Sequence, residues 1–264
     1  MISFSVAFVA IAAAFAIPAL LSLCVVFGSS RAVSPRYISA FALGVYFWFF
    51  SDTLGDSAYL GVNSGFSGGV EQAALLVFFA AGVLVLFYVD RKPFFSGMEA
   101  QAPGLGVPLL VALAVGIHGL GEGAAFTSVA ASTPAQDILS AFGGLAPAVA
   151  FVIHKTLEPV IVGAAYVTYA RDRTMNLAAS ARDLVLLAMV FVLPGLLGAA
   201  TGYWLSYDTT YVFALGLGTS IYAAVRLAKP LFISTGQSRW DSTKVALAMV
   251  LGFLSLYFAA LFHS

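Results

Sequence analysis

Long apolar runs, each close to the length of a membrane-crossing helix, constrain this chain more than any other feature of its sequence. An α-helix needs about 20 mostly apolar residues to cross the hydrocarbon core of a bilayer. Eight such runs are predicted as spans, near residues 3–27, 37–60, 72–89, 107–130, 139–170, 184–206, 210–232 and 243–263. None of the connecting segments is long enough to hold a soluble domain. We therefore predict an all-α, polytopic membrane protein whose residues 1–264 form a single transmembrane domain.

The composition agrees with a place in the bilayer and argues against nucleic acid as a partner. Hydrophobic residues make up 61% of the chain and charged residues only 9%, whereas an ordinary soluble domain has roughly 25% charged residues. The 12 basic and 12 acidic residues balance to a formal net charge of zero. The chain thus has no excess of positive charge with which to bind phosphates. The expected partner is the lipid bilayer.

The basic residues fall on one side of the predicted bundle. All except Lys155, which lies inside a predicted span, are in the loops after the first, third, fifth and seventh spans or at the adjoining helix ends. The charged residues of the opposite loops are all acidic, namely Asp56, Glu71, Asp137 and Asp208. Cytoplasmic loops of membrane proteins are enriched in Lys and Arg. We therefore predict that both termini lie outside the cytoplasm, in a multi-pass protein of the plasma membrane.

A short internal similarity links the second and seventh spans. "FALGVYFWFFSDTLGDS" and "FALGLGTSIYAAVRLAKP" begin with the same four residues, and their predicted directions across the membrane are opposite. Inverted repeats around a site near the bilayer midplane are common in transporters. The similarity predicts inverted-repeat character for the bundle.

Two pairs of ionisable residues lie deep inside predicted spans. His118 and Glu122 occur in "GIHGLGEGAAF", and His154 and Glu158 occur in "FVIHKTLEPVIVGAAY". A spacing of four residues places both side chains of a pair on one helix face, one turn apart. A charged carboxylate near the bilayer centre costs ~2.5–3.5 kcal/mol on insertion scales. Each pair therefore needs something that offsets this cost.

A bound metal ion would supply the missing positive charge. Two imidazoles and two carboxylates from neighbouring helices make a four-ligand shell that suits Zn²⁺. The lack of cysteine ligands favours a passing ion over a closed structural site, because structural zinc sites are usually rich in thiolates. Two other interpretations stay open: polar contacts that only join helices, and a proton relay, which needs no convergence of ligands.

These motifs resemble those of the ZIP (Zrt/Irt-like) family of divalent metal transporters. "AVGIHGLGEGAAF" is similar to that family's fourth-helix motif of His, Asn, any residue, Pro, Glu and Gly, and "FVIHKTLEPVIVG" is similar to its fifth-helix partner. "DTLGDS", "FFAAGVLVLFYVDR" and "LGFLSLYFAALFHS" resemble the family's second, third and last spans. The resemblance implies a ZIP-like bundle with both ends outside, in which a moving group of helices works against a scaffold that often dimerises.

Two departures from the family pattern predict a mononuclear site. Gly119 stands where the family usually has Asn, and Lys155 stands where many members have Asn or Asp. A charged lysine is not a metal ligand. Lys155 is three residues before Glu158, near enough on a helix to pair with it. Its ammonium is expected either to take the place of a second cation, or only to neutralise one glutamate or extend toward an interface.

Glycine and proline residues predict irregular backbone around both motifs. Gly121 replaces the family's proline, within a stretch that also contains Gly116, Gly119 and Gly123. These glycines predict either a kink that opens a cavity or close helix packing. Pro159 removes a backbone hydrogen bond directly after Glu158.

Two aspartates are predicted at the outer end of the second span. Asp52 and Asp56 can raise the local concentration of cations near the pathway, although solvation at the interface is sufficient to explain them. Asp52 lies further into the span and is the stronger candidate.

The sequence therefore predicts a transporter rather than an enzyme. The expected cargo is a divalent transition metal, most of all Zn²⁺, which moves toward the cytoplasm past His118, Glu122, His154 and Glu158. Cd²⁺, Fe²⁺, Mn²⁺ and Co²⁺ accept the same ligands. The alternatives are a membrane-embedded metal hydrolase, in which the metal activates a water molecule, and a metal sensor or receptor that does not transport.

Overall fold

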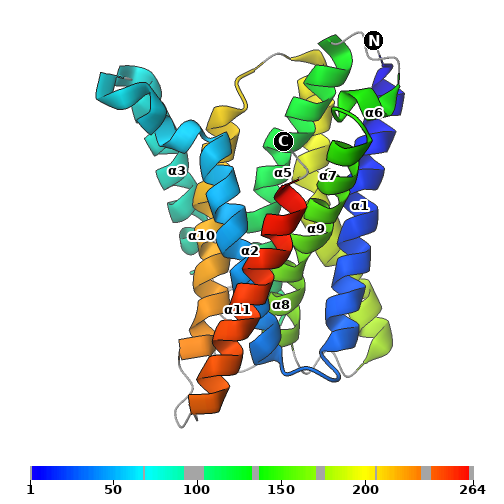
Figure 1. Cartoon of the computed structure of the whole chain (residues 1–264), viewed down its shortest axis with the longest axis vertical. Coiled ribbons are helices and arrows are strands. Elements are labelled where there is room, and N and C mark those ends of the chain that lie inside the picture. The colour runs from blue at the N-terminus through cyan, green and yellow to red at the C-terminus, as the bar shows by residue number, and fades with distance from the viewer. Residues whose placement is uncertain are drawn as a thin grey trace.

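The protein is a bundle of helices that run along one common axis (Figure 1). The structure is a computed structural model and describes residues 2–67, 69–91, 104–132, 137–170, 176–205, 207–232 and 239–261. The helices are α1 (Phe4–Ser29), α2 (Pro35–Asp56), α3 (Gly69–Asp90), α5 (Gly106–Ser132), α6 (Ile138–Ala141), α7 (Leu145–Leu157), α8 (Pro159–Tyr169), α9 (Leu177–Trp204), α10 (Thr210–Phe232) and α11 (Arg239–Ala260), with a 3₁₀ segment, η1 (Ala58–Ser67), after α2. No strand occurs among the described residues, which confirms the all-α prediction.

The number of spans agrees with the sequence prediction. Within the described ranges, eight helical stretches are long and apolar enough to cross a membrane, and α7 and α8 together form one of them, Leu145–Tyr169. The chain is therefore a multi-pass membrane protein in contact with lipid. The even number of spans brings the start of α1 and the end of α11 toward the same end of the bundle (Figure 1). Lys92, Arg171, Arg173 and His263 lie outside the described residues.

Three predicted boundaries were wrong for identifiable reasons. The span predicted at 184–206 begins earlier, at Leu177, because the Asn176 side chain accepts a hydrogen bond from the Ala179 N–H and caps the helix. The span predicted at 139–170 is interrupted after α6, where Gly143 and Gly144 adopt positive φ angles of 87° and 119°. The span predicted at 37–60 ends at Asp56, where the 3₁₀ segment takes over.

Helix α5 lies at the centre of the bundle and packs closely along α9. A Cβ atom built on Gly123 would lie 2.1 Å from the Gly195 carbonyl oxygen, and one on Gly198 would lie 1.9 Å from the Leu120 carbonyl oxygen. Only glycine permits backbones to approach this closely. Because α5 continues unbroken from Gly106 to Ser132, the structure supports the packing interpretation of its glycines.

We expect a single methyl group at Gly198 to disrupt this contact. Gly198→Ala should lower the free energy of unfolding by about 1–3 kcal/mol, the usual cost of overpacking. Thermal unfolding in detergent measures the effect, and Gly28→Ala is the matched control, since nothing lies within 4 Å of a Cβ built there. Equal melting temperatures for both variants would contradict the close α5–α9 packing.

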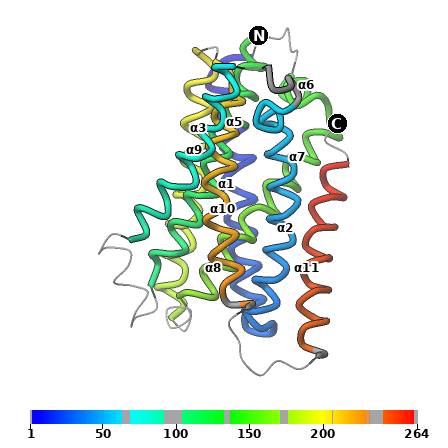
Figure 2. The backbone as a smooth tube through the Cα atoms, turned by 90° about the vertical axis from the view of Figure 1, so that its left-hand side faces the viewer, coloured from blue at the N-terminus to red at the C-terminus, as the bar shows by residue number. Residues whose placement is uncertain are grey.

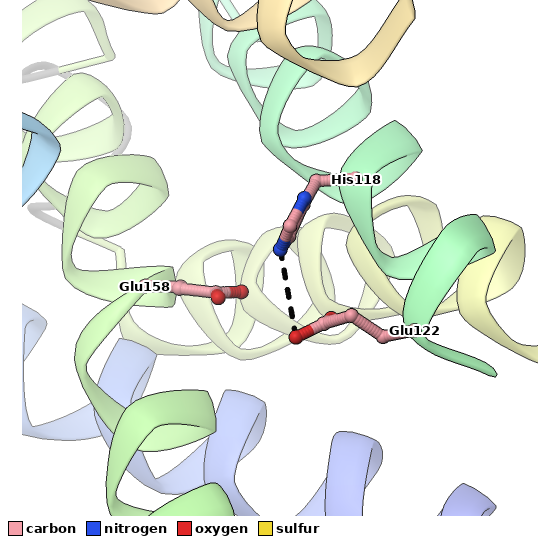
Figure 3. Close-up of side chains that lie close together, drawn as sticks. All are labelled: His118, Glu122 and Glu158. Carbon is pink, nitrogen blue, oxygen red and sulfur yellow. Dashed lines mark ion pairs between the residues drawn. The ribbon is translucent and has the colours of Figure 1, made fainter. Parts of the chain in front are cut away.

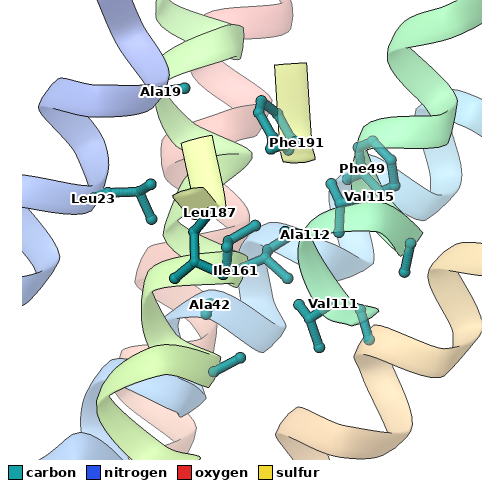
Figure 4. Close-up of a cluster of buried hydrophobic side chains, with 14 of the residues drawn as sticks. Ala19, Leu23, Ala42, Phe49, Val111, Ala112, Val115, Ile161, Leu187 and Phe191 are labelled. Atoms are coloured by element: carbon teal, nitrogen blue, oxygen red, sulfur yellow. The ribbon is translucent and has the colours of Figure 1, made fainter. Parts of the chain in front are cut away.

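The hydrophobic core fills the space between α1, α2, α5, α8 and α9. Leu23, Phe49, Val111, Ile161 and Leu187 are among its buried side chains (Figure 4). Helices α3 and α11 are much less enclosed, with only 17% of their most apolar windows buried inside the protein. In Figure 2, α11 stands at the margin of the bundle beside α2. The exposed apolar side chains of α3 and α11 therefore face lipid.

Two Arg–Tyr–Asp clusters join helix pairs at the end opposite to the start of α1. In the first, Asp90 on α3 forms an ion pair with Arg226 on α10 and accepts a 3.0 Å hydrogen bond from the Tyr222 hydroxyl. In the second, the Asp241 side chain on α11 forms an ion pair with Arg36 and accepts a 2.6 Å hydrogen bond from the Tyr37 hydroxyl, both on α2. The α3–α10 pair and the α2–α11 pair are thus each joined by an aspartate that binds an arginine and a tyrosine of the other helix.

Candidate metal centre

Helix α5 presents the first predicted pair toward the interior of the bundle. His118 and Glu122 lie one turn apart, as their spacing predicted, with 3.5 Å between His118 Nε2 and Glu122 Oε1. The His118 side chain is buried, whereas Glu122 retains 14% exposure. Both residues are near the middle of the 27-residue helix. The pair therefore lies deep in the membrane-spanning region.

A break in the fifth span positions Glu158. The Glu158 N–H still donates to the His154 carbonyl oxygen at 3.2 Å, but Pro159 has no N–H to continue the ladder, so α7 ends and α8 begins here. The Glu158 side chain is 1% exposed. The loosening predicted from Pro159 thus places a buried carboxylate at mid-span.

The two helices bring three predicted ligands together. One ligand atom each of His118, Glu122 and Glu158 lies within 4.8 Å of the others, and the Glu158 carboxylate points toward the gap between His118 and Glu122 (Figure 3). A tetrahedral zinc ion with ligand bonds of about 2.0–2.2 Å separates its ligand atoms by roughly 3.4 Å. The His118–Glu122 distance of 3.5 Å already fits this geometry. A small closure by Glu158 would complete a three-ligand site.

Lys155 lies between the two carboxylates. Its ammonium donates to both oxygens of Glu158, each at 2.8 Å, and forms an ion pair with Glu122 Oε2. Its side chain is fully buried, so it does not extend toward an interface. The aromatic rings of Phe15 and Phe151 lie 5.1 and 5.7 Å from the ammonium and contribute cation–π attraction. Lys155 therefore pairs with two glutamates rather than one.

The two carboxylate oxygens of Glu122 contact different residues. Oε2 pairs with Lys155 and Oε1 faces His118. With Glu122 and Glu158 ionised and Lys155 charged, this trio carries a net charge of −1. The single ammonium does not balance both carboxylates, and His118 and His154 are the other groups that contact them.

His154, the fourth predicted ligand, lies at the edge of this group. Its Nε2 is 2.8 Å from Glu158 Oε1 and 3.9 Å from Asp52 Oδ2. The group of converging ligand atoms comprises the other three residues. His154 thus connects Glu158 with Asp52 in this conformation.

A cavity leads to the site from the end of the bundle where α1 begins. It has a volume of about 340 Å³, and its wall includes Asp52, Asp56, Glu122, His154 and several aromatic side chains. The Asp52 side chain is 37% exposed. Glu122 belongs to both the cavity wall and the ligand group. The two aspartates singled out in the sequence thus line the approach to the predicted ligands.

Sequence reasoning missed the neighbours that hold His118. Thr53, Phe49 and Phe213 surround its ring. Thr53 directly follows Asp52, and Phe213 opens the "FALG" stretch of α10. Neither position carries a signal that distinguishes it from ordinary helix packing, so only the assembled bundle identifies it.

Comparison with known protein families and curated proteins does not assign the chain to a family. No family model matches the chain, and no curated protein is significantly similar to it. A function is therefore indicated only by the site itself and by the sequence motifs.

Proposed function

We propose that this protein transports a divalent transition metal ion, with Zn²⁺ as the preferred cargo, across the plasma membrane toward the cytoplasm in the manner of ZIP-family transporters. The observation that carries the proposal is the convergence of His118, Glu122 and Glu158 at mid-span, beside a cavity lined by Asp52 and Asp56. A cation would enter along the aspartates, reach Glu122 in the cavity wall, and bind between α5 and the α7–α8 break.

The ligand chemistry suits a passing ion. One imidazole and two carboxylates bind Zn²⁺, Cd²⁺, Fe²⁺, Mn²⁺ or Co²⁺, whereas closed structural zinc sites usually have four ligands rich in thiolate. The adjacent Lys155 ammonium repels a divalent ion and so favours its release. Because Lys155 fills the space beside the two glutamates, we propose a mononuclear site.

Reciprocal glycine contacts join two further helix pairs, in the same way as they join α5 and α9. Between α2 and α11, Cβ atoms built on Gly44 and Gly252 would approach the Met249 and Phe41 carbonyl oxygens. Between α10 and α3, Gly218 and Gly82 would approach Phe79 and Leu215 in the same reciprocal manner. We propose that these helix pairs are equivalent parts of two inverted halves, in a protein that dimerises as its ZIP resemblance implies.

Metal entry and metal binding in one preparation test the proposed function. Proteoliposomes that enclose a Zn²⁺-sensitive dye should show saturable entry with the native protein and none above empty liposomes with Glu122→Gln. Glu71→Gln, which alters an exposed acid at the start of α3, is the matched control and should transport normally. The same vesicles report bound Zn²⁺ after washing.

The result also separates transport from the other candidate functions. Native protein that binds Zn²⁺ but passes none would overturn transport and favour a hydrolase or a sensor. A three-ligand site leaves a coordination position open for water, so hydrolysis of amide or ester substrates would then be assayed. Normal entry with Glu122→Gln would overturn the assignment of this site as the pathway.

A further inference from the structure

We propose that Thr53 is a positioning residue that holds His118 with its Nδ1 protonated and its Nε2 free to bind the metal. The inference rests on the proposed metal site and names the group that prepares one of its ligands. The hydrogen bond joins α2 to α5. The His and Glu motifs lie on α5 and on α7–α8, so neither motif includes a residue of α2.

The hydroxyl of Thr53 has only one proton, and it donates that proton to a backbone carbonyl oxygen. Thr53 is fully buried on α2, and its Oγ1 donates to the Phe49 carbonyl oxygen one turn earlier at 2.9 Å. The same Oγ1 lies 3.4 Å from His118 Nδ1. Since the Thr53 proton is already given to Phe49, Oγ1 can only accept from the ring. The second contact therefore requires an N–H at Nδ1.

Two aromatic side chains pack against the His118 ring. Phe49 packs against it edge-on, with centroids 4.9 Å apart, and Phe213 lies 5.2 Å away on α10. Gly216 lets α10 approach the His118 backbone, because a Cβ built there would lie 2.9 Å from His118 Cα. In this position of the ring, Nδ1 faces Thr53 Oγ1 and Nε2 lies 3.5 Å from Glu122 Oε1.

This arrangement prepares His118 as a ligand. A neutral imidazole binds a metal through its unprotonated nitrogen, and the tautomer is set by the hydrogen bond that the other nitrogen makes. Thr53 keeps the proton on Nδ1, so Nε2, which faces Glu122, is the nitrogen that gives up its proton to bind the metal. Loss of such a supporting group typically weakens metal affinity 10–100-fold.

Substitution at Thr53 tests the inference. Thr53→Val keeps the shape and removes the hydroxyl, and it should weaken Zn²⁺ binding 10–100-fold by calorimetry of the full-length protein in detergent. Thr53→Ser restores the hydroxyl and should recover native affinity. Thr201→Val is the matched control, because that hydroxyl bonds the Leu197 carbonyl oxygen in α9. Native affinity in Thr53→Val, or a failure of serine to rescue, would overturn the proposal.

A spectroscopic readout separates this inference from the proposed function. The chain has three histidines, so ¹⁵N-histidine spectra of the metal-free protein are simple, and His118→Gln assigns the signal. In the native and Thr53→Ser proteins, His118 Nδ1 should give the signal of a protonated, hydrogen-bonded nitrogen, and Thr53→Val should lose that hydrogen bond. A native His118 without a proton on Nδ1 would overturn the role of Thr53 even if transport is established. An absence of Zn²⁺ binding together with the expected Nδ1 signal would count against the metal site instead.

Discussion

Replacement of Lys155 by methionine is expected to destabilise the metal-free protein by about 3–5 kcal/mol, the usual cost of removing one partner from a buried ion pair. Methionine keeps the length of the side chain but leaves the Glu122 and Glu158 carboxylates in one buried space without the ammonium that contacts both. Thermal unfolding in detergent, with a chelator present, measures this loss.

Zn²⁺ should reverse the loss in the same variant. The ion would replace the ammonium as the counter-charge, and its affinity should rise about tenfold or more because a neighbouring positive charge is gone. A ligand at 100 times its dissociation constant stabilises the folded state by ≈ 2.7 kcal/mol. Zn²⁺ should therefore raise the melting temperature of Lys155→Met more than that of the native protein.

Lys244→Met is the control for the loss of a lysine as such. Lys244 is exposed on α11, and its replacement should change neither the melting temperature nor the response to Zn²⁺. If Lys155→Met were as stable as Lys244→Met without metal, the two-carboxylate ion pair would not be a stabilising feature of the protein.

Glu158→Gln is expected to weaken Zn²⁺ binding by more than about 100-fold, whereas His154→Ala should stay within the 10–100-fold range of supporting residues. The ranking follows from the geometry. Glu158 belongs to the converging ligand group, but His154 contacts that group through the Glu158 carboxylate, at 2.8 Å. Calorimetry with Zn²⁺ measures both affinities, and dye-reported entry into proteoliposomes should fall in the same order.

The comparison also tests the four-ligand shell predicted from the sequence. Equal losses for Glu158→Gln and His154→Ala would show that His154 moves into the shell when metal binds. Glu71→Gln again serves as the exposed-acid control. Native affinity in Glu158→Gln would remove this residue from the site altogether.

Local spacing was enough to predict much of the site. His118 with Glu122, and His154 with Glu158, lie on common helix faces because residues four apart always do. The pairing of Lys155 with Glu158 follows from a spacing of three. Pro159 correctly marked a break in the helix, because its missing N–H interrupts the backbone ladder wherever it stands.

Spacing along the chain could not predict the contacts between different helices. The ion pair of Lys155 with Glu122 crosses from α7 to α5, and the Thr53–His118 contact crosses from α2 to α5. No spacing along the chain encodes either contact. Both depend on the depth and rotation of α5 against its neighbours, which close glycine contacts such as that of Gly198 with Leu120 help to set.

The sequence alone determined the eight spans and the pairing of each His with its Glu. The length of an apolar run is set by the thickness of the bilayer, and a spacing of four residues places two side chains on one helix face. Tertiary packing decided which charged groups meet. It gathered His118, Glu122 and Glu158, left His154 at the edge, and placed the Lys155 ammonium between two carboxylates. The reason is that a buried charge is stable only beside its partners, and side-chain positions across helices exist only once the backbones have packed.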